Sequence, residues 1–309
     1  MNKTRSTFLY VIVLIGAYFI GVLVRQKKSP PLNSTLTPLF QIFGKSTKSI
    51  DLAITKIMPI DKMDEKQYGD KIAEIYLQSA DTSNSDYKYL NKLIRNISQY
   101  AKKPFNYRVF IVPYSQPNAF ALPGGVICVT DGLLHNLKTE GEIVSVLAHE
   151  MGHIENGHCL SDVKFEILSK KMQLGTLGEL TGYTTNFFLR HSFSKNQESE
   201  ADAYGYDLIL QTQYDPNQFS GAFKMLEAWE KDSVKMTDNN SHADIIRDYF
   251  MSHPPLQLRI SEYSEKSKVW WDEHKEEKRY IGETNLKNRK PFYEMIYENE
   301  WIINPDNSI

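Results

Sequence analysis

The stretch "SVLAHEMGHIENGH", from Ser145 to His158, lies in the most strongly patterned part of the chain and predicts a buried helix. Thr139 is followed three residues later by Glu142, which is the spacing of a capping box at the start of a helix. Gly157 suits the C-terminal stop, because glycine readily adopts the left-handed conformation found there. Between these signals an apolar face recurs at helical spacing, formed by Ile143, Val144, Leu147, Ala148, Met151 and Ile154.

The same helix carries two histidines on one side. His149 and His153 are four residues apart, so both imidazoles can reach one zinc ion at about 2.0–2.1 Å. Glu150 would point towards the open position of the ion, where it can take a proton from a zinc-bound water and pass it to a leaving amine. The alternative is a solvated helix whose histidines face water. The apolar face disfavours that alternative, because imidazoles in or beside a core need polar partners.

A third ligand is expected downstream, because a catalytic zinc ion takes three protein ligands and keeps one open site. Ser194 and Gln197 form a second capping box, which begins a helix that runs to about residue 211. Glu198 and Asp202 lie four residues apart on one face of this helix. Glu198 can bind the zinc ion, while Asp202 accepts the N–H of a ligating histidine. The alternative is an ordinary charged helix face, which would also include Glu200.

The amino terminus contains an uncharged apolar run, Phe8 to Val24, with basic residues on both sides. A membrane-spanning helix needs about 17–25 such residues. A cleavable signal peptide is the alternative, but the small residues of a cleavage site are absent from "GVLVRQKK". The run therefore favours an uncleaved anchor over residues 1–24, with the amino terminus inside and the following domain extracytoplasmic. Residues 25–66 are interpreted as a linker.

In the rest of the chain, segments with the apolar spacing of helices alternate with segments that have the spacing of strands. We expect helices over residues 67–78 and 87–101, a strand over residues 107–113, and a hairpin or small sheet around the turn "PGG" at residues 123–125. Residues 131–264 are expected to be mainly helical, with buried or membrane-adjacent helices in the sparsely charged segment 166–193. The charged, aromatic extension 265–309 receives no role.

The net charge bears on the class of partner, and the cysteine content bears on disulfide bonds. Lys and Arg number 36 against 38 Asp and Glu, a net charge of -2, so nothing favours a nucleic-acid partner. The two cysteines, Cys128 and Cys159, are expected to be buried free thiols, although a pair remains the alternative.

Four stretches together carry a resemblance to a known family. They are "NAFALPGGVICVTDGLL", "LAHEMGHIENGH", "SKNQESEADAYG" with "YDP" following, and "SHPPLQLRI", and they run from Asn118 to Ile260, about half of the chain. With these motifs the sequence resembles the HtpX-like and CAAX-prenyl-endopeptidase family of zinc metallopeptidases, which includes the Oma-type and BepA-type membrane-quality-control proteases. The resemblance implies one zinc ion per subunit with the ligands His149, His153 and Glu198, and Glu150 as general base. Asp202 would be the carboxylate behind a ligating histidine.

The resemblance also implies where a substrate lies. Asn118, Ala119 and Phe120 would belong to an edge strand beside the cleft, on which a peptide can lie as an added strand. His253 matches a family histidine near the active site, where it can stabilise the tetrahedral oxyanion or occupy the open site of the zinc ion. The alternative for His253 is a helix-start residue before Pro254.

Three further motif residues receive less specific roles. Glu200 is a rival for the third-ligand position, but its spacing to Asp202 does not fit the pattern. His158 lies beyond Gly157 and is interpreted as structural, as is Arg259. A single apolar segment argues against a multi-spanning CAAX-processing enzyme.

Together these features predict an α+β, mostly helical, zincin-like metallopeptidase domain with a small β-sheet over residues 67–264, tethered by one N-terminal transmembrane helix. Its expected activity is zinc-dependent hydrolysis of internal peptide bonds in unfolded or misassembled membrane and envelope proteins. The competing hypothesis is a non-catalytic or self-inhibited, chaperone-like binder. An aminopeptidase is disfavoured, because no motif supplies an anchor for a free amine.

Overall fold

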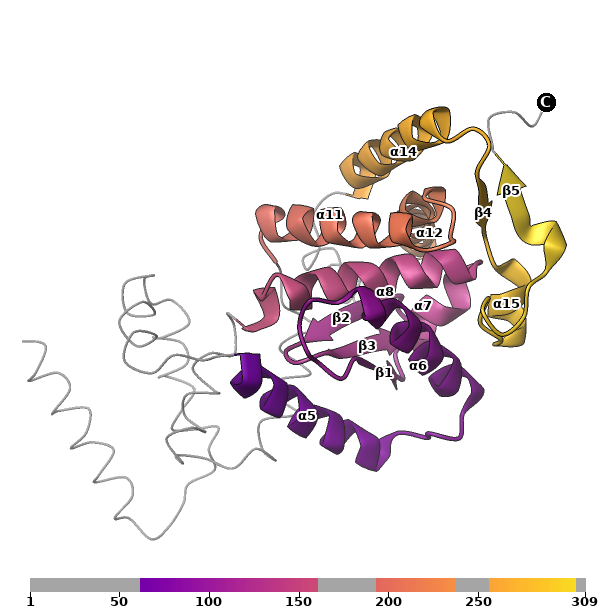
Figure 1. Cartoon of the computed structure of the whole chain (residues 1–309). Helices are drawn as coiled ribbons and strands as arrows, with labels where there is room; N and C mark the ends of the chain where they lie inside the picture. Colours follow the sequence, from indigo (N-terminus) through magenta and orange to yellow (C-terminus); the bar gives the residue numbers. More distant parts are fainter. Residues whose placement is uncertain (1–61, 161–192, 237–255, 304–309) are drawn as a thin grey trace, which may run out of the picture. The chain divides into compact units, whose positions relative to one another are not determined.

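The computed structural model describes residues 62–160, 193–236 and 256–303, all within one compact unit, Ile60–Ile309 (Figure 1). The predicted anchor, most of the linker, the sparsely charged segment up to residue 192, and His253 lie outside the described residues. None of the helices in the described ranges has the length and apolar content needed to cross a bilayer.

The first two helices pack against a small sheet. Helix α5 spans Lys62–Ser79 and α6 spans Ser85–Ile97, followed by the 3-10 turn η1, Ser98–Tyr100. The predicted helices at 67–78 and 87–101 therefore exist with shifted ends. Helix α6 begins earlier than its apolar spacing suggested, because the Asn84 side chain caps it by accepting from the backbone N–H of Asp86 at 2.7 Å.

The sheet has three strands in the order β1-β3-β2, with bounds Arg108–Val112, Ala119–Leu122 and Val126–Thr130 for β1, β2 and β3. Strand β3 pairs parallel with β1 and antiparallel with β2, which confirms the predicted hairpin. Gly124 and Gly125 make the turn with φ of 77° and 98°, values that favour glycine. Within the described residues β2 is an edge strand, because it is paired only with β3.

Helix α8, Glu140–Glu155, lies at the centre of the domain. Figure 1 shows it between the sheet and the pair α11, Lys195–Gln211, and α12, Asn217–Met236. The short helix α7, Asp131–Asn136, leads into it. Both predicted capping boxes are present, at the starts of α8 and α11, and Gly157 follows α8 with φ of 76°. The mostly helical α+β architecture with a small sheet agrees with the prediction.

Helices α8 and α11 approach each other unusually closely because small residues face each other. A Cβ atom at Gly152 of α8 would lie 2.6 Å from the carbonyl oxygen of Ala201 in α11. A Cβ atom at Gly205 of α11 would lie 3.0 Å from the backbone nitrogen of His149. The two backbones are thus in direct contact along the stretch that carries the predicted metal ligands.

The carboxyl-terminal residues complete the same unit. Helix α14 spans Leu256–Glu273, so the predicted boundary at residue 264 falls inside a helix. It is followed by β4 (Lys278–Tyr280), α15 (Glu283–Asn288), the 3-10 turn η3 (Glu298–Glu300) and β5 (Trp301–Ile303), and β4 pairs antiparallel with β5. The buried Trp271 indole donates to the Asp215 carboxylate at 2.9 Å, which docks α14 onto the start of α12.

This extension also caps the start of α8. The backbone N–H groups of Glu140 and Gly141 donate to the carbonyl oxygens of Gly282 and Ile281 at 2.9 and 3.0 Å. The fully buried Glu140 carboxylate accepts from the backbone N–H of Phe292 at 2.7 Å and from two tyrosine hydroxyls, those of Tyr89 and Tyr214. Donors that the first turn of a helix leaves unsatisfied are therefore paired by a segment over 100 residues away.

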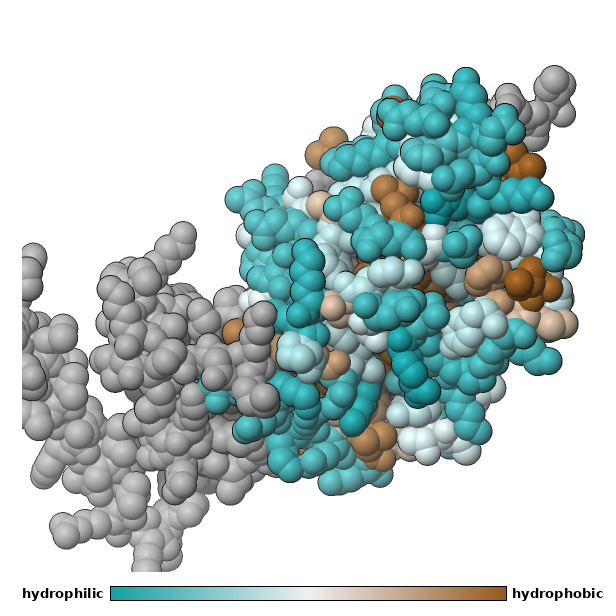
Figure 2. Space-filling model, in the orientation of Figure 1, coloured by the Kyte–Doolittle hydropathy of each residue, from teal (hydrophilic) through white to brown (hydrophobic). Residues whose placement is uncertain are grey.

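The surface is mainly polar. Figure 2 shows a largely hydrophilic face over the described residues, with apolar atoms in small, separate groups. Cys128 and Cys159 are both buried and are not joined by a disulfide, which confirms the prediction of two buried thiols.

Candidate metal centre

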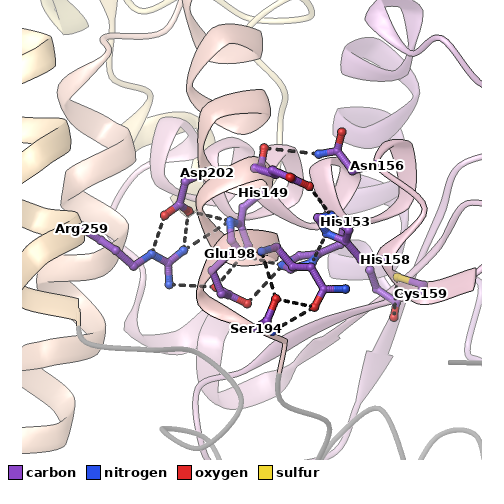
Figure 3. A network of polar contacts seen from close by, with 12 residues as sticks. His149, His153, Asn156, His158, Cys159, Ser194, Glu198, Asp202 and Arg259 are labelled. Carbon is purple, nitrogen blue, oxygen red and sulfur yellow. Dashed lines mark hydrogen bonds and ion pairs between the residues drawn. The ribbon is translucent and has the colours of Figure 1, made fainter. Parts of the chain in front are cut away.

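Three buried side chains from α8 and α11 converge on one point. The Nε2 atoms of His149 and His153 lie 3.2 Å apart. Glu198 Oε2 lies 3.7 Å from His149 Nε2, and Glu198 Oε1 lies 3.4 Å from His153 Nε2 (Figure 3). A tetrahedral zinc ion with bonds of about 2.0–2.2 Å sets its ligand atoms about 3.3–3.6 Å apart. Two imidazole nitrogens and a carboxylate at these separations form a donor set that fits zinc, and within the described residues these are the side chains grouped closely enough to hold an ion.

The close approach of the two helices explains this geometry. His149 and His153 point from the face of α8 that touches α11, and Glu198 points back from the first turn of α11. The site is also enclosed by apolar rings: the His153 ring stacks on Phe193 with centroids 3.9 Å apart, and Phe223 meets the His149 ring edge-on at 6.5 Å. In such a low-dielectric site a cation would interact strongly with the Glu198 carboxylate.

Asp202 holds His149 from behind. His149 Nδ1 lies 2.8 Å from Asp202 Oδ1, so the ring donates its Nδ1 proton to the carboxylate and turns Nε2 towards Glu198. Burial alone would raise the pKa of Asp202, but the charge of Arg259 and the hydrogen bond from His149 outweigh burial and lower that pKa below its ordinary value. Asp202 is therefore ionised and acts as an acceptor.

Arg259 of α14 joins this group, although sequence analysis assigned it only a structural role. Its Nε and Nη2 atoms donate to the two oxygens of Asp202 at 2.7 and 2.5 Å, and Nη1 lies 3.4 Å from Glu198 Oε2. The guanidinium also lies over the Phe223 ring, 4.0 Å from its centroid. Two buried carboxylates on one helix require a cation, and the guanidinium of arginine suits bidentate pairing with a carboxylate.

A second histidine arrangement lies behind His153. His158 Nδ1 contacts His153 Nδ1 at 3.0 Å, and His158 Nε2 contacts Glu200 Oε2 at 3.0 Å. Glu200, the rival for the third-ligand position, thus points to His158 and away from the cluster. Its side chain is 62% exposed, whereas His158 is buried.

Glu150 lies beside a cavity that opens next to the cluster. His149, Glu150 and Arg259 line one part of it. The apolar walls come from the edge strand, α7, α8 and α12, and they include Ala119, Leu133, Val146, Ala222, Phe223 and Leu226. The apolar character of these walls suits an apolar side chain.

The predicted edge-strand residues lie in and directly before β2. Ala119 borders the cavity, Phe120 faces Cys128 across the β2–β3 pair, and the backbone N–H of Asn118 donates to the Thr130 hydroxyl at 2.8 Å. The structure therefore brings together His149, His153, Glu198, Asp202 and Ala119. The position of His253 lies outside the described residues.

Comparisons with known proteins identify a family for this chain. Residues 85–267 match the model of peptidase family M48, and this stretch contains both helices of the site. Metalloprotease LoiP of Escherichia coli is 31% identical over 139 residues, which is 42% of this chain and 54% of LoiP.

Two further relatives match longer stretches of this chain at lower identity. The mitochondrial metalloendopeptidase OMA1 of Schizosaccharomyces pombe is 27% identical over 190 residues, 59% of this chain and 54% of that protein. A protease HtpX homolog of Desulforapulum autotrophicum is 27% identical over 235 residues, 63% of this chain and 74% of that protein. The chain spans about half the length of the first two of these relatives.

Proposed function

The chain belongs to peptidase family M48, and we propose that it is a zinc-dependent endopeptidase. The observation that carries the proposal is the convergence of His149, His153 and Glu198 at tetrahedral separations, with Glu150 beside them at the wall of a cavity. A zinc ion that serves structure usually has four protein ligands. Three ligands and a neighbouring carboxylate instead suit a catalytic centre.

His149, His153 and Glu198 would hold the metal. When bound, zinc supplies Lewis-acid polarisation of the scissile carbonyl and makes a water molecule nucleophilic near neutral pH. The protein keeps the ligands in place before the metal arrives, since Asp202 orients His149 and Arg259 balances the charge of Asp202.

Glu150 would move the proton. Its carboxylate takes the proton of the attacking water and delivers it to the amine nitrogen of the leaving peptide, so that one group serves first as base and then as acid. Glu150 is only 2% exposed, which excludes bulk water from the proton transfer. Glu150 follows His149 in α8, so its carboxylate and the two histidine ligands belong to one rigid element.

The substrate we propose is an internal segment of an extended polypeptide. In the described residues β2 pairs only with β3, and its other edge would accept a peptide as an added strand near Asn118, Ala119 and Phe120. One apolar side chain of that peptide would enter the cavity beside Glu150. Unfolded or misassembled membrane and envelope proteins fit this requirement, and the motif resemblance points to the same class.

We also propose a membrane tether formed by residues 8–24, with the catalytic domain extracytoplasmic, on the periplasmic side if the source is bacterial. The support is the uncharged length of this run and the basic residues on either side of it. We propose that His253 stabilises the tetrahedral oxyanion or occupies the open site of the zinc ion.

The test compares wild type with Glu150→Gln on unfolded casein, with and without a chelator. Cleavage by wild type alone, lost with the chelator, is expected, and the variant should keep its zinc because Glu150 is not a ligand. Glu265→Gln is the matched control, since it makes the same change at an exposed position of α14. Equal cleavage by wild type and Glu150→Gln would exclude the mechanism. Absence of cleavage by either protein, with zinc bound, would favour the self-inhibited or binding role.

A further inference from the structure

On the side away from Glu198, His153 is held by a hydrogen-bonded relay of two side chains, His158 and Glu200. Each hydrogen bond in this relay has a defined donor and acceptor. Its Nε2 faces Glu198 and its Nδ1 faces His158 at 3.0 Å. Figure 3 shows His158 on the side of His153 that is turned away from Glu198. The next contact joins His158 Nε2 to Glu200 Oε2, also at 3.0 Å.

The carboxylate of Glu200, at the outer end of this relay, determines which ring nitrogen of each histidine carries a proton. A carboxylate only accepts hydrogen bonds, so Glu200 requires the His158 proton on Nε2. His158 Nδ1 is then an acceptor, and it requires the His153 proton on Nδ1. This leaves the lone pair of His153 Nε2 directed at Glu198 and at a metal ion between them. We propose that His158 and Glu200 are positioning residues that hold His153 in its metal-binding tautomer. The inference rests on the proposed metal site.

The local backbone structure positions His158 and Glu200 beside His153. The left-handed Gly157, with φ of 76°, turns the chain out of α8 so that His158 faces the ring of His153. The Asn156 amide donates to the backbone carbonyl of Glu200 at 3.3 Å, which sets the register of α8 against α11 at this point. Phe193 packs against both imidazoles, with ring centroids 3.9 Å from His153 and 6.0 Å from His158.

The two imidazole ligands are thus oriented by different means. His149 donates to the buried Asp202, whose charge is balanced by Arg259. His153 is governed through His158 by Glu200, which lies at the surface. An exposed residue can be replaced without disturbing the core, so the relay can be tested at its outer end.

The test measures zinc affinity by chelator competition for Glu200→Gln, Glu200→Ala and Glu200→Lys. Glutamine still offers an acceptor oxygen, and alanine leaves His158 Nε2 to water, so losses of about fivefold or less are expected for both. An ammonium group beside His158 Nε2 only donates hydrogen bonds, so it favours the opposite tautomer of His158 and sets two N–H groups against each other. The affinity of Glu200→Lys should fall about 10–100-fold, the usual effect of losing such a partner.

Simple charge repulsion requires its own control. Asp207→Lys introduces a similar charge change at an exposed position of the same helix, and its loss of affinity should be about fivefold or less. Salt of about 1 M shortens the screening length to about 3 Å, so a through-space effect should vanish there. The tautomer effect of Glu200→Lys should persist in high salt.

The middle of the relay is tested at His158. Asparagine can place its Oδ1 near the position of the histidine Nδ1 and still accept from His153, whereas leucine cannot accept a hydrogen bond. His158→Asn should therefore keep zinc affinity within about fivefold and His158→Leu should lose about 10–100-fold. Nitrogen-15 NMR of the metal-free protein should show the His153 proton on Nδ1 in wild type and a mixed population in His158→Leu. Urea unfolding of the metal-free variants reports whether each retains its fold.

The outcomes separate this inference from the proposed function. Wild type that takes up no zinc would remove the metal site and the inference with it. Wild type that binds zinc tightly, together with equal affinities for Glu200→Lys and Asp207→Lys, would overturn the inference alone. So would an unchanged His153 tautomer in a folded His158→Leu variant.

Discussion

The contact between Gly152 and Ala201 makes a sharp prediction, because it sets the distance between the helices that supply the ligands. In Gly152→Ala the new Cβ would lie 2.6 Å from the Ala201 carbonyl oxygen and 2.8 Å from its Cα. Ordinary contact begins at 3.4 Å, and the obstacle is backbone, so α11 must move away. Overpacking of this kind costs about 1–3 kcal/mol, while exchanging glycine for alanine within a helix returns about 0.5–1 kcal/mol.

The matched control is Gly221→Ala in α12. The nearest atom to its Cβ is Oε1 of Glu142, at 3.2 Å. The capping-box bonds of Glu142 use Oε2, so Oε1 needs to shift by only a few tenths of an ångström. This variant should gain about 0.5–1 kcal/mol, whereas Gly152→Ala should lose about 1 kcal/mol. For a domain of this size the two should differ by about 4–8 °C in Tm in the metal-free state.

Zinc affinity supplies the second measurement. Metal–ligand distances tolerate changes of only about 0.2 Å, so a displaced α11 should weaken zinc binding in Gly152→Ala but not in Gly221→Ala. The reasoning is refuted if both variants are stabilised alike and bind zinc as wild type does. In that event the distance between α8 and α11 would not determine the zinc affinity of the site.

Three further predictions concern a buried acid, a hydrogen-bond acceptor and the cavity. Burial raises the pKa of Glu140 from 4.5 to about 7 although Tyr214 and Tyr89 donate to it. The folded domain holds this proton more tightly than the unfolded chain, so its stabilising effect is full below about pH 4.5 and declines by about 3 kcal/mol as the pH rises to about 7. Glu140→Gln should flatten that decline in urea unfolding. Asp202→Asn should lower zinc affinity about 10–100-fold in chelator competition, because His149 loses its charged acceptor. Val146→Phe should narrow the cavity and slow cleavage of peptides with a large apolar residue at the scissile bond about tenfold relative to alanine peptides, as read by mass spectrometry.

Features that depend on neighbouring residues could be predicted from the sequence. The capping boxes at Thr139 and Ser194, the "PGG" hairpin and the four-residue spacing of the histidines are local, and the structure contains all of them. The convergence of Glu198 on the histidines was inferred from motif order, and the structure places these groups together.

Features that depend on contacts between residues distant in sequence could not be predicted in the same way. Arg259 is 57 residues from Asp202, and nothing near either residue in sequence indicates their bidentate contact. Glu200 resembled a ligand or a surface charge, because its role depends on the turn at Gly157 that presents His158. Glu140 resembles an ordinary acidic residue in the first turn of a helix, and only the packing of the tail reveals that it is fully buried.

The docking of the tail onto α8 has a practical consequence for handling the protein. A single proteolytic nick between Ile281 and Phe292 would release the carbonyls that satisfy the two leading amides of α8 and one donor to the Glu140 carboxylate. Each orphaned group costs about 1–3 kcal/mol, which is a large share of the margin that keeps a domain folded. A preparation could therefore lose activity through damage at the end of the ligand-bearing helix opposite its chemistry, while every residue at the metal remained intact.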